Sequence, residues 1–172
     1  MNKFLEDCWE FNRLGDTPID DSYENLYQAF KIIESEFEEL KENLDKYKLA
    51  SKIEGSRKEQ LKAEILDDLG DIDVTVASFA YRMGLKRTIF ECAQYTIATA
   101  NLSKFPESLE EAVESVVNYE DDPRYENVDY KQIDDERFVV FGNPVGTSVY
   151  KVLKGVGFED PQKKLNDLMK ID

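Results

Sequence analysis

The sequence predicts a mainly α protein, an antiparallel bundle of four to five helices followed by a small C-terminal β-hairpin. Between residues 21 and 104, apolar residues recur at the 3.6-residue spacing of amphipathic helices. Glycine, proline or Ser-x-x-Glu patterns, which are typical of helix ends, separate these stretches. Only residues 137–153 show short β-branched and aromatic runs around a turn. We therefore expect a single domain over residues 1–172, with a helical core at about 21–120 and a β-containing extension at about 121–172.

The first part of the chain predicts a short helix and then a long one. Residues 5–14 form a short amphipathic stretch that ends at the loop 15–20. A long helical pattern follows over residues 21–48. Asp21 and Glu24 form a capping-box pattern at its start, because such side chains satisfy the free N–H groups of the first helical turn.

Two more helices are expected after a glycine-containing linker. Ser56 and Glu59 form a second capping box, and Gly84 stands where a glycine commonly ends a helix. A helix is therefore expected over residues 56–83. The next apolar pattern predicts a helix over residues 85–104, which ends shortly before a proline.

The C-terminal third changes character. Ser108 and Glu111 cap a further short helix, and residues 121–136 are polar and rich in turn residues. Two short strands are predicted at 137–142 and 147–153, joined by a Gly-Asn-Pro-Val-Gly turn. The expected β element is therefore a two-stranded hairpin.

Composition excludes several classes of protein. The chain has 172 residues and a net charge of −15, so nucleic acid and anionic membranes would repel it. No apolar run approaches the length of a membrane span, and the N-terminus lacks the apolar region of a signal peptide. Two distant cysteines and no histidine argue against a disulfide scaffold or a zinc site. A reducing, cytoplasmic setting is expected.

Four carboxylates occupy matched positions on the two long helices. Beside the apolar stripe of the first, Glu36 lies about 60° to one side and Glu39 about 120°. Asp68 and Asp71 have the same offsets from the stripe of the second helix. Helices joined by a short connection pack antiparallel, so the matched flanks meet on one side of the pair. The stripes consist of Ile33, Phe37, Leu40 and Leu44 on the first helix and Ile65, Leu69, Ile72, Val76 and Phe79 on the second.

Converging carboxylates repel one another unless protons or cations intervene. Ligation by oxygen alone suits Mg²⁺ or Mn²⁺, which share their remaining positions with water or phosphate. An acidic pair on a helix is also a common solvated surface in so acidic a chain, and this alternative stays open. Glu34 and Glu38 fall on the other flank and are expected to face water.

At these residues the sequence resembles the all-α nucleoside triphosphate pyrophosphohydrolases, the MazG-like superfamily. That superfamily also includes phosphoribosyl-ATP pyrophosphohydrolase and the dimeric dUTPases. Its signature of ExxE, a spacer and ExxD is read here at residues 36–39 and 68–71, where Asp68 replaces the usual glutamate. Asn12 stands where related chains often have histidine, and Ala100 where serine is expected. Four ordered segments over roughly residues 9–161 resemble a bacteriophage branch: AFKIIESEFEEL, DLGDIDVTV, NLSK at 101–104 and KVLKG at 151–155.

The resemblance implies a metal-dependent enzyme that cleaves a nucleoside or deoxynucleoside triphosphate to the monophosphate and pyrophosphate. Mg²⁺ or Mn²⁺ would be held by Glu36, Glu39, Asp68 and Asp71, and Glu39 would orient the attacking water. Family members are usually homodimers or homotetramers. The resemblance assigns substrate contacts to Lys31, Asn101, Lys104 and Lys154.

Two alternatives accompany this hypothesis. Each of the lysines can also be an ordinary solvated or helix-end cation. Because Asp68 is one methylene shorter than glutamate, the chain can also be a degenerate member that keeps the fold and acts as an acidic binding or regulatory protein.

Overall fold

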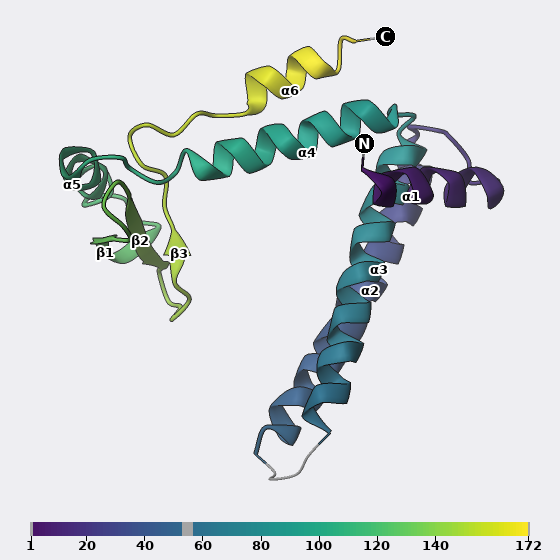
Figure 1. Cartoon of the computed structure of the whole chain (residues 1–172), viewed down its shortest axis with the longest axis horizontal. Helices are drawn as coiled ribbons and strands as arrows, with labels where there is room; N and C mark the ends of the chain where they lie inside the picture. The colour runs from purple at the N-terminus through teal and green to yellow at the C-terminus, as the bar shows by residue number, and fades with distance from the viewer. Residues whose placement is uncertain (1, 53–56, 172) are drawn as a thin grey trace. The chain divides into compact units, whose positions relative to one another are not determined.

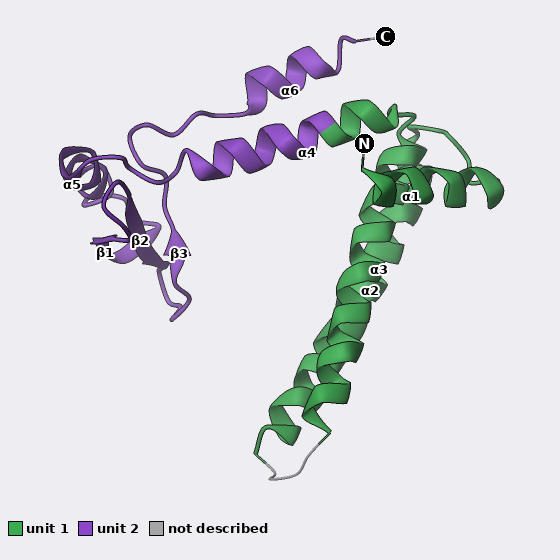
Figure 2. Cartoon of the chain, in the orientation of Figure 1, with its two compact units in different colours: residues 1–91 green, residues 92–172 purple. Residues whose placement is uncertain are grey.

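The structure, a computed structural model, describes residues 2–52 and 57–171. Over these residues the chain forms six helices and a three-stranded antiparallel sheet near its C-terminal end, which confirms the predicted mainly α class (Figure 1). None of the described helices combines the length and the apolar character needed to cross a membrane. The chain divides into two compact units, residues 1–91 and 92–172 (Figure 2), whereas the sequence placed the change of character near residue 120.

Unit 1 is built on a helical hairpin. Helices α2 (Tyr23–Ala50) and α3 (Lys58–Arg82) run side by side in opposite directions, and α1 (Lys3–Leu14) packs against α3 (Figure 1). Helix α4 (Arg87–Leu102) begins in this unit and ends in unit 2. The hairpin is the feature that brings the two acidic motifs onto neighbouring helices.

The start of α2 differs from the prediction by one residue. Ser22, and not Asp21, is the N-cap, and its Oγ accepts a hydrogen bond from the backbone N–H of Asn25 at 3.4 Å. The carboxylate of Asp20 accepts hydrogen bonds from both the N–H and the Oγ–H of Ser22, at 2.9 and 2.7 Å. These two contacts hold the serine in place, which a capping pattern read from the sequence alone does not reveal.

The boundaries of α3 are partly as expected. The predicted cap residue Ser56 lies outside the described residues, and Arg57 at the N-cap makes no side-chain capping bond. Gly84 has φ of 74° just beyond the helix, which confirms the predicted C-terminal glycine. A Cβ at this position would approach Ile19 to 3.3 Å, so the turn also packs closely.

The small core of unit 1 lies between α1 and α3. Leu5, Cys8 and Ala77 are buried there, with Trp9, Val74 and Phe90 packed around them. Asn12, only 2% exposed, donates hydrogen bonds from Nδ2 to the carbonyl of Cys8 at 2.8 Å and to Ser78 Oγ at 2.9 Å. These bonds join the buried face of α1 to α3.

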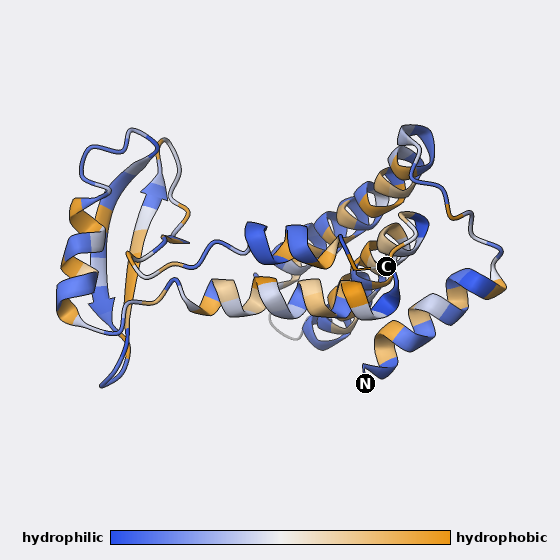
Figure 3. Cartoon of the chain, turned by 90° about the horizontal axis from the view of Figure 1, so that it is seen from above, coloured by the Kyte–Doolittle hydropathy of each residue, from blue (hydrophilic) through white to orange (hydrophobic). Residues whose placement is uncertain are grey.

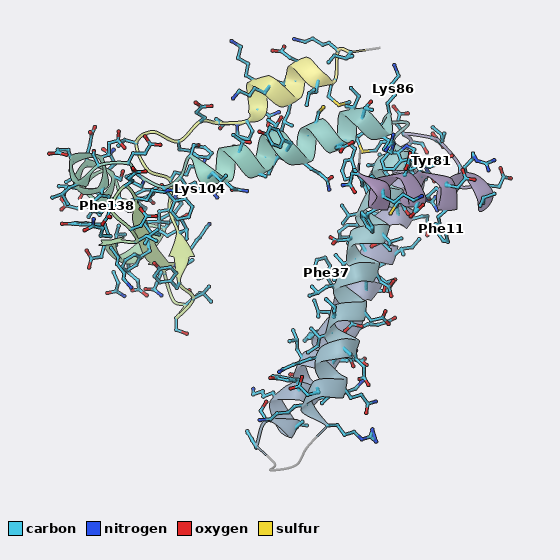
Figure 4. All side chains as sticks on the ribbon, viewed as in Figure 1. Phe11, Phe37, Tyr81, Lys86, Lys104 and Phe138 are labelled. Carbon is cyan, nitrogen blue, oxygen red and sulfur yellow. The ribbon has the colours of Figure 1, made fainter. Side chains whose placement is uncertain are left out.

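The predicted apolar stripes are only partly buried. Ile72 is buried, but Phe37, Leu44 and Leu69, which belong to the same stripes, are 53%, 48% and 46% exposed. Phe37 projects away from the helix pair in Figure 4. Two helices meet along a single line, and residues beside that line keep much of their surface in water. Hydrophobic residues accordingly alternate with hydrophilic ones along the helices in Figure 3.

Unit 2 combines a short helix with a small sheet. Strands β1 (Tyr125–Gln132), β2 (Phe138–Pro144) and β3 (Lys151–Val152) pair antiparallel in that order. Helix α5 (Leu109–Val117) packs against β1 and β2. The predicted cap of α5 is confirmed, since Ser108 Oγ accepts from the N–H of Glu111 at 3.2 Å.

Three elements of unit 2 differ from the expectation. Strand β1 lies in residues 121–136, which were expected to form turns, and its register shifts between Glu126 and Asp129. It is polar because it lies at the sheet edge, where pairing with β2 outweighs intrinsic propensity. The strand expected over residues 147–153 contracts to β3, and helix α6 (Gln162–Leu168) was not predicted.

The core of unit 2 surrounds β2. Val140, Leu153 and Ala112 are buried together with Ser115. The Oγ of Ser115 donates to the carbonyl of Glu111 at 2.6 Å and accepts from the N–H of Val156 at 3.0 Å. The segment that follows β3 is thereby attached to α5.

Gly155→Ala should destabilise unit 2. A Cβ at this position would lie 2.9 Å from the carbonyl oxygen of Lys104 and 3.0 Å from Cγ of Pro106. Since one of these neighbours is backbone, we expect a loss of about 1–3 kcal/mol in the free energy of unfolding, measured by urea denaturation. Gly157→Ala is the matched control, because no atom lies within 4 Å of its added Cβ. Equal stability of the two variants would contradict the close approach.

Candidate functional site

The four predicted carboxylates share one electrostatic neighbourhood in unit 1. Partial burial raises the pKa of Glu36 above its ordinary value, and the negative charges of Glu39, Asp71 and Asp68 raise that pKa further. Glu39 and Asp71 are exposed, whereas Glu36 is half-buried. The helical hairpin thus holds like charges from α2 and α3 close enough to affect one another.

Asp68 is the most buried of the four, with 8% of its surface exposed. Both of its carboxylate oxygens accept hydrogen bonds from Nδ2 of Asn43 on α2, at 2.9 and 3.2 Å. The Nζ of Lys46 donates in turn to Asn43 Oδ1 at 2.7 Å. An amide donor orients the carboxylate and leaves each oxygen a free lone pair. Asn43 therefore positions the one residue that departs from the glutamate of the motif.

Asn43 was not among the predicted site residues, although its position in the sequence contains a signal for it. It follows Glu36 by seven residues, which places it within about 20° of that glutamate around the helix axis. It therefore lies on the same flank of α2 as the acidic motif. Amide side chains on such a flank are candidates for orienting metal-ligating carboxylates.

The opposite flank of α2 is occupied by ordinary surface residues. Glu38 is exposed, and Glu34 is partly exposed and forms an ion pair with Lys31. The ammonium of Lys31 is not an unpaired charge, because it forms this ion pair with Glu34. In this structure Lys31 therefore has a local partner within its own helix.

A cavity of about 400 Å³ opens beside Glu36 and Asp71 within unit 1. Apolar atoms form most of its wall surface, although polar side chains also line it, and a pocket of this size suits a small ligand. Asn12 contributes a buried amide whose Oδ1 accepts no hydrogen bond from any described residue. The other lining residues are Phe11, Thr17, Ala29, Ile32, Val74, Thr75, Ser78 and Arg82.

The remaining predicted substrate contacts lie in unit 2. Lys104, just beyond the end of α4 (Figure 4), lines a cavity of about 220 Å³ together with Lys154. Asn101 is exposed on α4 and does not line it. The structure therefore brings together the two predicted lysines of this unit and leaves Asn101 apart.

Carboxylate oxygens are the donor type that a hard divalent cation prefers. Within residues 2–52 and 57–171, no group of three or more Asp, Glu, Cys or His side chains is arranged so that it could hold a metal ion. Glu36, Glu39, Asp68 and Asp71 nevertheless offer oxygen donors alone, and a cation would relieve the repulsion among them. Glu36, Glu39 and Asp71 retain solvent access, and Asp68 is held by Asn43.

Comparison with known proteins does not identify the chain. It matches no family model, no curated protein and no solved structure.

Glu36→Gln should stabilise the protein in the absence of divalent metal. The change removes a half-buried charge that lies among three like charges. We expect the free energy of unfolding in EDTA to rise by about 0.5–1 kcal/mol, as for the loss of partly screened repulsions. Glu38→Gln, on the exposed flank, is the matched control and should change little. A loss of stability in Glu36→Gln would show that Glu36 makes favourable contacts and not repulsive ones.

Proposed function

We propose that this protein is a metal-dependent nucleotide pyrophosphohydrolase, which converts a nucleoside or deoxynucleoside triphosphate to the monophosphate and pyrophosphate. The observation that carries the proposal is a cavity whose wall surface is mainly apolar and whose lining includes Glu36 and Asp71. A nucleotide has an uncharged planar end and a polyphosphate end that requires cations. A cavity beside a carboxylate cluster suits both ends of such a ligand.

The carboxylates have distinct roles in this proposal. Glu36, Glu39, Asp68 and Asp71 would hold Mg²⁺ or Mn²⁺, and Asn43 keeps the carboxylate of Asp68 in position. When bound, Mg²⁺ would supply charge neutralisation for the triphosphate and polarise its phosphoryl centre. Glu39 is exposed and orients the attacking water or accepts its proton. The water oxygen bonds to the α-phosphorus, and the bond from that phosphorus to the oxygen bridging to the β-phosphate breaks.

The cavity accounts for the nucleoside end of the substrate. Phe11 lines it with an exposed aromatic ring on which a base can stack. Asn12 Oδ1 offers an unused acceptor to an N–H group of the base. The proposed substrate contacts of Lys31, Asn101, Lys104 and Lys154 rest on the sequence resemblance, and Lys31 would have to leave Glu34 to make its contact.

The proposed active form is a homodimer or homotetramer. The helical hairpin exposes many apolar residues, more than the few scattered ones that are normal on the surface of a monomer. A second copy of the hairpin would bury it in the manner of a four-helix bundle. The exposed apolar residues on α2 and α3 include Tyr27, Phe30, Ile32, Phe37, Leu44, Leu66, Leu69 and Val76.

The enzyme should release pyrophosphate, and not orthophosphate, from at least one triphosphate in the presence of Mg²⁺ or Mn²⁺. A panel of ribo- and deoxyribonucleoside triphosphates, with the products separated by ion-exchange chromatography, measures this directly. Glu39→Gln and Asp71→Asn should each lower the rate by about 100-fold or more, because they remove ligands of the charged centre.

The controls separate catalysis from folding. Glu38→Gln should keep the wild-type rate, and thermal melting of all variants reports whether they fold. Orthophosphate as the product would indicate a different phosphohydrolase. No turnover of any nucleotide, together with no effect of Mg²⁺ on the melting temperature, would favour an acidic binding or regulatory protein that keeps the fold.

Wild-type protein should have a solution mass of at least twice the 19.9 kDa chain in light scattering after gel filtration. Leu44→Asp places a charge on the exposed apolar surface of the hairpin and should shift the mass toward the monomer. Val149→Asp is the matched control, because it changes an exposed apolar residue in unit 2. A monomeric wild-type protein at all concentrations would remove the support for an oligomeric site.

A further inference from the structure

Unit 2 contains a cationic pocket in a strongly acidic chain. The cavity of about 220 Å³ is lined by four basic residues and two tyrosines, and no carboxylate lines it. The chain as a whole has 37 acidic and 22 basic residues, so a local excess of positive charge runs against its composition. The cationic pocket is defined by Lys104, Arg124, Lys151, Lys154, Tyr119 and Tyr125.

One of the four cations is already neutralised. Arg124 binds Asp122 through Nε and Nη2, at 2.9 and 2.7 Å to the two carboxylate oxygens. This contact lowers the pKa of Asp122 to about 2, so the pair stays ionised at neutral pH. The guanidinium remains available at Nη1, which makes no hydrogen bond to a described residue.

The three lysines of the pocket have no such partner. Among the ion pairs formed by residues 2–52 and 57–171, none involves Lys104, Lys151 or Lys154. In a chain with an excess of carboxylates, three lysines that share a cavity without any ion pair give that cavity a net positive charge. Such a charge favours an anionic ligand.

The lysines are held by the fold of unit 2. Lys151 lies on β3, where it pairs with Gly142 of β2, and its Nζ donates to the hydroxyl of Tyr125 at 3.4 Å. Its ammonium also lies 5.6 Å from the centre of the Tyr125 ring, and the Arg124 guanidinium lies 5.5 Å from the same centre. Two cations therefore converge on one aromatic ring.

The other side of the pocket is fixed by backbone contacts. The N–H of Lys154 donates to the hydroxyl of Tyr119 at 3.2 Å, and the N–H of Gly155 donates to the carbonyl of Lys104 at 3.1 Å. The Lys154 ammonium lies 4.1 Å from the centre of the Phe158 ring. The segment after β3 is thus joined to the chain just beyond α4, and this brings two of the lysines together.

The donors of the pocket match a group with several acceptor oxygens. Ammonium and guanidinium groups only donate, and both tyrosine hydroxyls already accept a hydrogen bond, so their own protons are free to donate. A volume of 220 Å³ is below the range of about 300–1,000 Å³ that drug-sized ligands occupy. We propose that the cationic pocket binds a phosphate or diphosphate group without the help of a metal ion.

The sequence resemblance assigns Lys104 and Lys154 to the substrate of the proposed hydrolysis, whereas the metal-free anion binding proposed here rests on the contacts of unit 2 alone. The cationic pocket lies wholly in unit 2 and uses none of the carboxylates assigned to metal binding. Binding by lysines alone needs no divalent cation, whereas the carboxylates of unit 1 can meet phosphate only through one. Removal of metal therefore distinguishes the two sites.

The test is calorimetric titration of the full chain with pyrophosphate and, separately, with orthophosphate in EDTA. Wild-type protein should bind pyrophosphate, and binding should weaken as NaCl is added. Lys151→Ala with Lys154→Ala should weaken binding by at least about tenfold, since two charge-assisted contacts are lost. Replacement of the same two lysines by arginine should largely preserve it.

A matched control and a second site separate the possible outcomes. Lys131→Ala with Lys163→Ala removes the same charge from exposed positions of unit 2 outside the pocket, and should leave binding within about twofold of wild type. Glu36→Gln should leave binding in EDTA unchanged. The proposal is overturned if wild-type protein binds neither anion, or if the two alanine pairs weaken binding equally. Loss of metal-dependent hydrolysis in Glu36→Gln with intact binding in EDTA would separate this site from the proposed catalytic one.

Discussion

The repulsion among four carboxylates is the constraint on which the proposed site depends. Helices α2 and α3 lie side by side, so charges that each helix alone would leave in water come within reach of one another. This arrangement affects Glu36 most, because its partial burial and its acidic neighbours both make its ionised form less favourable. Apolar packing must compensate for this repulsion, yet few apolar residues of the hairpin are buried. A cation, and a second hairpin over the exposed apolar residues, would each relieve part of this imbalance.

The helices of unit 1 were predictable because their signals are local. Periodicity, caps and glycines act within a few residues, and Gly84 occupies the left-handed conformation that its position indicated. The burial of each face was less predictable. Phe37 and Leu69 have the spacing of core residues, but burial depends on how many neighbours surround a helix pair. A helical wheel contains no information on that number.

Unit 2 shows where prediction from sequence ends. Strand β1 has the composition of a loop and is a strand because the apolar strand β2 needs an antiparallel neighbour. The pairing joins segments whose relation no local pattern encodes. In the candidate site, the four carboxylates could be predicted from their local spacing in the sequence. The hydrogen bond from Asn43 to Asp68 could not, because it joins two different helices. Arg124 and Lys151 likewise belong to a cluster that only the folded sheet assembles.

The contact between Asn43 and Asp68 has a consequence for the way the hairpin can move. Asn43 stands two turns beyond Glu36 on α2, while its partner stands on α3. Sliding one helix along the other by a single turn, about 5.4 Å, would separate the amide from the carboxylate. The buried carboxylate of Asp68 would then be left without its hydrogen-bond donor. The hydrogen bonds between Asn43 and Asp68 therefore fix the axial alignment of α2 against α3.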